Sequence, residues 1–195
     1  MELLEMIRER RSIRKYKDVP VEREKLEKIA EAGIFAPNPG GRQSAKIIML
    51  EDPVLIEEIG IINADCENRN RGGFGVSDEQ PSILDDLTIK SGFYGCTALG
   101  IVCLPSDFAK SVNGIGSAFT VAENMVLAAM ELGVSSCIVG RAEATFSKPE
   151  TEHLLDKWGL PDYMAVVFVC LGYIDGDYPK IKPRKENRVL FWEAK

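Results

Sequence analysis

Residues 114–140 read GIGSAFTVAENMVLAAMELGVSSCIVG, and they join the longest helical pattern of the chain to a short apolar run. Apolar residues occupy most sides of the helical part, 114–132, which is typical of a helix buried in a core. Gly133 is a plausible end for that helix. Residues 135–139 are then a strand candidate that runs into Gly140. The stretch therefore predicts a buried central helix followed directly by a strand.

Shorter patterns on both sides of this stretch mix helix and strand. Pro53 suits the first turn of one helix, and Ser147 with Glu150 forms a capping box for another. Because helices and strands do not alternate strictly, we predict an α+β layered fold for a single domain spanning 1–195. We expect helices at 2–11, around 26–34, and at 53–62, 114–132 and 147–158, and strands at 46–50, 99–104, 135–139 and 164–171.

Composition narrows the classes of function. The 195 residues carry a net charge of −6, which disfavours nucleic-acid binding through a basic surface. No run of roughly 20 apolar residues is present to span a membrane, and the amphipathic start lacks the apolar core of a signal peptide. The five cysteines form no CxxC pair and their number is odd, which is typical of a reducing compartment. With His153 as the single histidine, a His-rich metal site is excluded, and we expect a cytoplasmic protein without a metal or a membrane partner.

A cluster of basic residues, Arg10-Arg11-Ser12-Ile13-Arg14, follows the first predicted helix. Guanidinium groups form paired hydrogen bonds with phosphate oxygens, and a serine hydroxyl adds a further donor. The cluster therefore predicts an anion site. Taken alone, it is explained at least as well by a solvated basic helix end, where arginine complements the helix dipole.

Three later segments can likewise be interpreted either as ligand-binding segments or as ordinary structure. The loop 36–44 contains two prolines and two glycines, which suits a stiff backbone lying against a flat ring or an ordinary connecting loop. Residues 133–141 end a strand at a glycine, whose backbone either meets a ligand or simply turns. The basic run 182–185 is either an anion-binding arm or a solvated tail. The polar tail from Tyr173 closes on the apolar residues 189–192, and we expect it to dock on another subunit.

In this order, the four segments resemble the nitroreductase family of flavin enzymes. The most specific pairing is Arg-Arg-Ser-x-Arg-x-Tyr at 10–16 followed by Ala-Pro-Asn-x-x-x-x-Gln at 36–43. The resemblance is completed by Glu-Leu-Gly-Val at 131–134, Ile-Val-Gly at 138–140 and Leu-Gly-Tyr at 171–173, and it covers nearly the whole chain.

The resemblance implies an α/β/α sandwich with a mostly antiparallel central sheet. It implies an intertwined homodimer that holds FMN at its interface and exchanges its C-terminal arms, here about 173–195. The implied activity is transfer of hydride from NADH or NADPH through flavin N5 to a small aromatic or quinone-like acceptor, in a ping-pong scheme. Because the flavin carries that chemistry, no catalytic acid, base or nucleophile is expected.

The resemblance also implies which residues bind FMN. The basic cluster and a basic pair on the C-terminal arm would bind the phosphate and ribityl chain. The loop after the second helix would lie against the ring of the partner's flavin, and the end of the 135–139 strand would face the ring edge. Many relatives have Asn at the position of Gly41 and Pro-Trp at Ser44-Ala45, and Phe74 or Phe93 would line the substrate pocket. The expected FMN-binding residues are Arg10, Arg11, Ser12, Arg14, Pro37, Asn38, Pro39, Gly41, Asn70, Val139, Gly140, Lys182 and Arg184.

Other functions remain compatible with the same residues. A non-enzymatic flavin-binding or flavin-sensing protein would share the fold and the cofactor. A family member with a different flavin chemistry, such as dehalogenation, would usually need an extra lid segment. A phosphate-binding regulatory module would use the basic cluster without any flavin. The sequence leaves the physiological acceptor and the preference for NADH or NADPH open.

Overall fold

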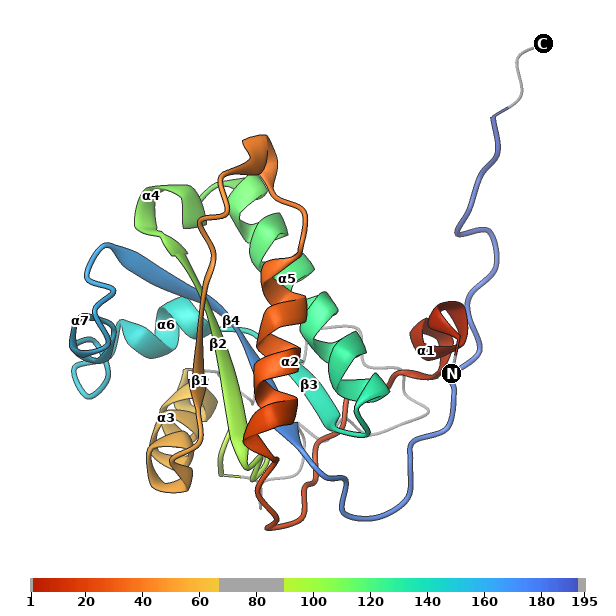
Figure 1. Cartoon of the computed structure of the whole chain (residues 1–195), viewed down its shortest axis with the longest axis horizontal. Helices are drawn as coiled ribbons and strands as arrows, with labels where there is room; N and C mark the ends of the chain where they lie inside the picture. Colours follow the sequence, from red (N-terminus) through yellow and green to blue (C-terminus); the bar gives the residue numbers. More distant parts are fainter. Residues whose placement is uncertain (1, 67–89, 193–195) are drawn as a thin grey trace.

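The computed structural model describes residues 2–66 and 90–192 (Figure 1). The helices are α1 (Leu3–Glu9), α2 (Arg23–Ile34), α3 (Pro53–Asp65), α4 (Ser106–Ala109), α5 (Val112–Glu131), α6 (Ala142–Phe146) and α7 (Leu154–Lys157), with a 3-10 turn η1 (Pro39–Gly41). The strands are β1 (Lys46–Leu50), β2 (Ala98–Pro105), β3 (Ser135–Val139) and β4 (Tyr163–Gly172). None of the described helices is long and apolar enough to cross a membrane.

The four strands form one sheet in the order β1-β2-β4-β3, and every neighbouring pair is antiparallel. The predicted strands therefore all exist, with ends that differ by one residue at most. The register pairs Leu99 with Cys170 across the centre of the sheet, and Cys170 in turn pairs with Cys137 on β3. The β3 strand is thus an edge of the sheet, which leaves its outer side open to other segments of the chain.

Side chains alternate between the two faces of the sheet and build two cores. On β2, Leu99 and Ile101 enter one core, whereas Val102 and Leu104 enter the other. The helices α2 and α5 cover the second core, and α3, α6 and α7 cover the first. Figure 1 shows the same three layers, so the predicted α+β sandwich is confirmed.

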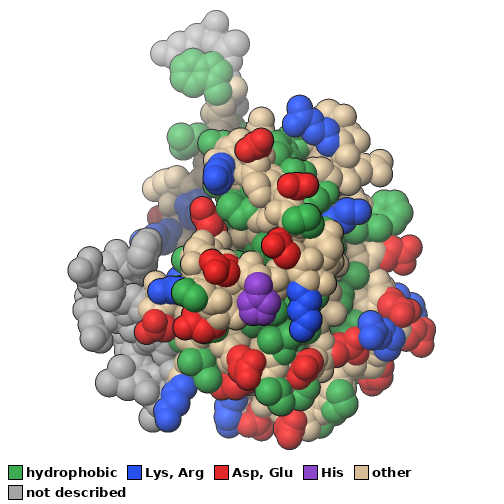
Figure 2. All heavy atoms as spheres, turned by 90° about the vertical axis from the view of Figure 1, so that its left-hand side faces the viewer, with side chains coloured by type: hydrophobic (Ala, Val, Ile, Leu, Met, Phe, Trp, Pro, Cys, Tyr) green, Lys and Arg blue, Asp and Glu red, His purple; other side chains and the backbone are tan. Residues whose placement is uncertain are grey.

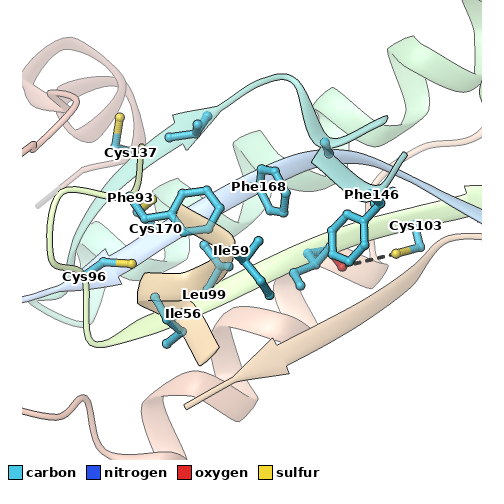
Figure 3. Close-up of a cluster of buried hydrophobic side chains, with 14 of the residues drawn as sticks. Ile56, Ile59, Phe93, Cys96, Leu99, Cys103, Cys137, Phe146, Phe168 and Cys170 are labelled. Atoms are coloured by element: carbon cyan, nitrogen blue, oxygen red, sulfur yellow. Dashed lines mark hydrogen bonds between the residues drawn. The ribbon is translucent and has the colours of Figure 1, made fainter. Parts of the chain in front are cut away.

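Aromatic rings fill the first core (Figure 3). The rings of Phe93 and Phe168 lie edge to face with centroids 4.8 Å apart, and Phe146 packs beside Phe168. Phe93 is fully buried in this core, so the expectation that it lines the substrate pocket is wrong. Its ring instead fixes the turn before β2 to the sheet. Phe74, the other residue expected there, lies outside the described residues.

Two helices differ from their predicted form. Of the predicted 147–158 helix, only α7 is helical, so most of this prediction is wrong. The Ser147 hydroxyl donates to the Glu143 carbonyl at 2.7 Å, at the end of α6, instead of capping a new helix. The central helix α5 is buried along most of its length, as predicted, but Val112, Ile115 and Phe119 at its first half are exposed. Their spacing places them on one apolar stripe, which is exposed in the described part of the chain.

The outer surface over α3, α6 and α7 is an ordinary charged face. Figure 2 shows acidic and basic side chains interspersed there. His153, just before α7, is exposed on this side of the molecule. The face is on the opposite side of the sheet from α2 and α5.

Candidate functional site

The segment after α1 is pinned to the free edge of β3. Ser12 forms a parallel bridge with Ser136, and the Ile13 N–H donates to the Ser136 carbonyl at 2.9 Å. Ile13 is buried, and the buried Tyr16 donates its hydroxyl to the Ile13 carbonyl at 2.7 Å. The backbone of the basic cluster is therefore fixed by the sheet, although sequence alone left it as a helix end.

Two arginines of the cluster carry buried N–H groups without a partner among the described residues. These groups are Nη1 of Arg10 and both Nε and Nη2 of Arg11. Arg11 uses only its Nη1, which donates to the Arg8 carbonyl at 2.7 Å and to the Arg10 carbonyl at 2.6 Å. The Nε of Arg10 lies 4.0 Å from the Glu123 carboxylate on α5.

These unpartnered groups decide between the two interpretations of the cluster. A guanidinium N–H removed from water without an acceptor is costly, whereas an anion accepting from it forms a strong, charge-assisted bond. A solvated helix end would leave the same groups in water. The donors thus fit a phosphate group better than they fit a solvated helix end.

Arg14 lies on a neighbouring part of the site. Its guanidinium carbon is 5.9 Å from the centroid of the Tyr94 ring, within the range of a cation–π contact. Tyr94 has φ +58°, a left-handed conformation that is unusual for a bulky residue. Burial raises the pKa of the Cys137 thiol below this pair, and the nearby Arg14 and Ser12 partly oppose that rise. The ring of Tyr94 therefore helps to hold the Arg14 charge beside β3.

The other end of β3 carries Val139 and Gly140. Val139 is buried in the first core, and Gly140 borders a pocket of about 430 Å³ that Arg141, Ile115 and Phe119 also line. Because a strand rises by about 3.3 Å per residue, Gly140 lies roughly 13 Å along β3 from the Ser136 that pairs with Ser12. This separation suits an elongated ligand with an anionic group at one end and a ring at the other.

A buried polar residue that sequence reasoning missed supports this second end. Asn63, in the last turn of α3, is fully buried and donates to the Gly140 carbonyl at 3.1 Å. Arg141 donates back to the Asn63 side-chain oxygen at 2.9 Å. The available signal was an asparagine inside the otherwise apolar run of this helix, where a polar group needs a specific partner.

The loop of the expected ring contacts lies elsewhere in the chain. Pro37 and Pro39 are exposed, and the loop 36–43 lies beside the first half of α5 (Figure 1). The Asn38 side-chain oxygen accepts from the Gln43 N–H at 2.9 Å, which closes the loop on itself. Gly41 adopts φ +61°, so an asparagine there would need a left-handed backbone. Among the described residues, no hydrogen bond or ion pair joins this loop to Arg10 or Arg11.

The C-terminal arm begins beside Arg11 and then extends away from the rest of the described chain. The Tyr178 hydroxyl accepts from the Arg11 N–H at 3.1 Å and donates to the Glu9 carbonyl at 3.2 Å. Beyond this contact, Lys182 and Arg184 are exposed on an extended arm (Figure 1). One chain therefore does not bring them to the cluster. Asn70, another expected FMN contact, lies outside the described ranges.

Comparison with known proteins identifies the family of this fold. The profile of the "Nitroreductase family" matches residues 7–173. An NADPH-flavin oxidoreductase from Vibrio harveyi is 28% identical over 194 residues, which cover 97% of this chain and 72% of that protein. A nitroreductase with bound FMN from Bacteroides fragilis is 26% identical with a TM-score of 0.80, covering 99% of this chain and 100% of its own. A nitroreductase with bound FMN from Desulfitobacterium hafniense shares the fold at the same TM-score and coverage, with 24% identity. The chain belongs to the nitroreductase family.

Proposed function

We propose that the chain is an FMN-dependent NAD(P)H oxidoreductase that reduces a small aromatic or quinone-like acceptor. The observation that carries this proposal is the set of buried N–H groups on Arg10 and Arg11 that have no partner among the described residues. FMN contains the phosphate that such groups need, and the family relatives with bound FMN support the same assignment.

The residues along β3 would bind different parts of FMN. Arg10 and Arg11 would bind the phosphate, with Ser12 as a neighbouring hydroxyl donor. Arg14 would place a positive charge near the ring, where it stabilises negative charge that develops on reduction. Val139 and Gly140 would face the ring edge with backbone groups.

When bound, FMN supplies the redox chemistry, accepting hydride from NADH or NADPH at N5 and passing it to the acceptor. The chain's own contribution is then binding, orientation and electrostatic stabilisation. His153 is exposed on the opposite side of the sheet from α5 and takes no part in this scheme.

A second subunit would complete each site in this proposal. The apolar stripe of Val112, Ile115 and Phe119 on α5 is exposed, as are Phe191 and Trp192 at the end of the arm, with 90% and 95% of their surfaces in contact with solvent. Exposed apolar groups of this size are typical of an interaction surface. The partner would then supply the 37–39 loop against the ring and a basic arm with Lys182 and Arg184.

Reduction of the bound flavin tests the proposed enzyme directly. The purified protein is made anaerobic, NADH or NADPH is added, and the visible absorbance of the flavin is followed before and after addition of a quinone. We expect bleaching by one of the nucleotides and recovery of colour with the quinone. Flavin colour without bleaching would favour a flavin-binding or flavin-sensing protein, and a protein without flavin affinity would contradict both.

Truncation tests the role of the arm. Removing the chain from Lys180 onward should shift the monomer–dimer equilibrium toward monomer and lower FMN retention, because the apolar end and the basic pair are lost together. Sedimentation and flavin content after gel filtration measure both effects. An unchanged equilibrium with full flavin content would count against an exchanged arm.

A further inference from the structure

Asn63 connects α3 to the turn that follows β3, using every polar group of its side chain. Its Nδ2 donates to the Gly140 carbonyl at 3.1 Å and to the Thr145 hydroxyl at 3.0 Å. Its Oδ1 accepts from Arg141 Nη2 at 2.9 Å. Such a fully satisfied, fully buried amide is typical of a group that specifies one local geometry.

The turn before β2 closes over the other side of this amide. The Gly92 N–H donates to the Gly60 carbonyl on α3 at 2.7 Å. A Cβ atom at Gly92 would collide with the side-chain oxygen of Asn63, so only glycine permits this approach. Two residues further on, the same turn carries Tyr94, whose ring faces Arg14. Asn63 therefore joins the Gly140 end of the proposed FMN site to the turn that carries Tyr94.

The hydrogen bond to Gly140 sets the orientation of the next peptide group. In a trans peptide, the carbonyl and the N–H point in opposite directions. With the Gly140 carbonyl held toward α3, the Arg141 N–H of the same peptide is directed away from α3. Arg141 adopts φ +66°, which persists only where surrounding contacts impose it. Its carbonyl accepts from the Thr145 hydroxyl at 2.8 Å, so Thr145 belongs to the same support.

We propose that Asn63 is a positioning residue for FMN, which fixes the peptide between Gly140 and Arg141 so that its N–H is presented to the ring edge. This inference rests on the proposed function of the same site. A donor fixed at the ring edge stabilises the reduced, more negative ring more than the oxidised ring. Asn63 would thus raise the reduction potential of the bound flavin without touching it.

Two substitutions test this role through the midpoint potential of the bound flavin, which loss of a purely structural residue would leave unchanged. Asn63→Ala removes the amide, and Thr145→Val removes the hydroxyl that both Asn63 and Arg141 use. The affinity of the apoprotein for oxidised FMN is measured by titration, and the midpoint potential of the bound flavin is measured against a reference dye without oxygen. The potential reports the ratio of affinities for reduced and oxidised FMN.

We expect Asn63→Ala to weaken binding of reduced FMN about tenfold more than binding of oxidised FMN, which lowers the potential by about 30 mV for a two-electron couple. Thr145→Val should shift the potential in the same direction, and Thr145→Ser, which keeps the hydroxyl, should restore it. Ser117→Ala is the matched control, because Ser117 is also a buried hydroxyl but donates within α5 to the Asn113 carbonyl. It should leave the potential unchanged.

Each result decides the matter. A folded, flavin-loaded Asn63→Ala protein with the potential of the parent overturns the positioning role while leaving the proposed function intact. If Asn63→Ala does not fold, equal potentials for Thr145→Val and Thr145→Ser overturn it. A parent protein that binds no FMN overturns the proposed function first and this inference with it.

Discussion

Substitution of Arg11 by alanine separates a ligand-binding arginine from a structural one. The side chain makes two hydrogen bonds through Nη1, to the carbonyls of Arg8 and Arg10. Their loss should cost about 2 kcal/mol at the usual ~1 kcal/mol each. The substitution also removes two buried N–H groups without described partners, and relief of each is worth about 1–3 kcal/mol. We therefore expect the free energy of unfolding of the apoprotein to stay the same or to rise, by about 0–4 kcal/mol.

The effect on FMN should be much larger. Nε and Nη2 of Arg11 can each donate a charge-assisted hydrogen bond worth about 1.5–3 kcal/mol. Loss of both should weaken FMN binding by about 3 kcal/mol or more, which corresponds to about a 100-fold rise in Kd.

The assay combines urea unfolding of the apoprotein with titration of FMN by fluorescence quenching. Arg8→Ala is the control, because the Arg8 side chain is exposed at the end of α1, just before the cluster, and should contribute little to either quantity. The reasoning is refuted if Arg11→Ala destabilises the apoprotein by about 3 kcal/mol while the FMN affinity stays that of the parent. That result would make Arg11 a structural residue of the helix end.

Three further substitutions or treatments test the fold around the site. Phe168→Ala should cost about 3–5 kcal/mol in urea unfolding, because the ring is fully buried between Phe93 and Phe146; a loss below about 1 kcal/mol would contradict the packing of the first core. Burial raises the pKa of Cys137 and Cys170, and that of Cys103 to about 12. We therefore expect a thiol reagent at mildly alkaline pH to label the half-buried Cys66 first and these three only after unfolding, and rapid native labelling of Cys103 would speak against its burial. Hydrogen bonds from Tyr173, from a backbone N–H and from Lys25, in decreasing order of effect, lower the pKa of Glu22 from 4.5 to about 2. A lowered folded-state pKa gives stability that is complete above pH 4.5 and is lost as the pH falls toward 2, so Glu22→Gln should flatten the unfolding free energy across that window, and an unchanged slope would argue against the contact.

The strands were predictable because their signals are local. The apolar runs at 46–50, 99–104, 135–139 and 164–171 end at glycines, prolines or charged residues, and the structure extends them by no more than one residue at either end. The prediction of a helix at 147–158 was wrong for an equally local reason. The Ser147 hydroxyl could either cap a following helix or bond back to Glu143, and only the fold decides between these partners.

The site was only partly predictable because it depends on distant contacts. The basic cluster was visible in the sequence, but its burial follows from pairing with Ser136 on the edge of β3. The sequence offers Asn63 as a polar residue in an apolar run but does not give its partners, because they lie 77 to 82 residues further along the chain. Lys182, Arg184 and the 37–39 loop lie away from the cluster in a single chain, so they contribute to the site only if a second subunit supplies them, as proposed above.

The central claim is that the buried N–H groups of Arg10 and Arg11 beside β3 hold the phosphate of FMN. Riboflavin tests it most directly, because riboflavin is FMN without that phosphate. Affinities of both ligands are measured for the parent apoprotein and for Arg11→Ala. We predict that the parent binds FMN at least about 100-fold more tightly than riboflavin. Most of this preference should vanish in the variant. Equal affinities of the parent for FMN and riboflavin, or an undiminished preference in Arg11→Ala, would contradict the claim.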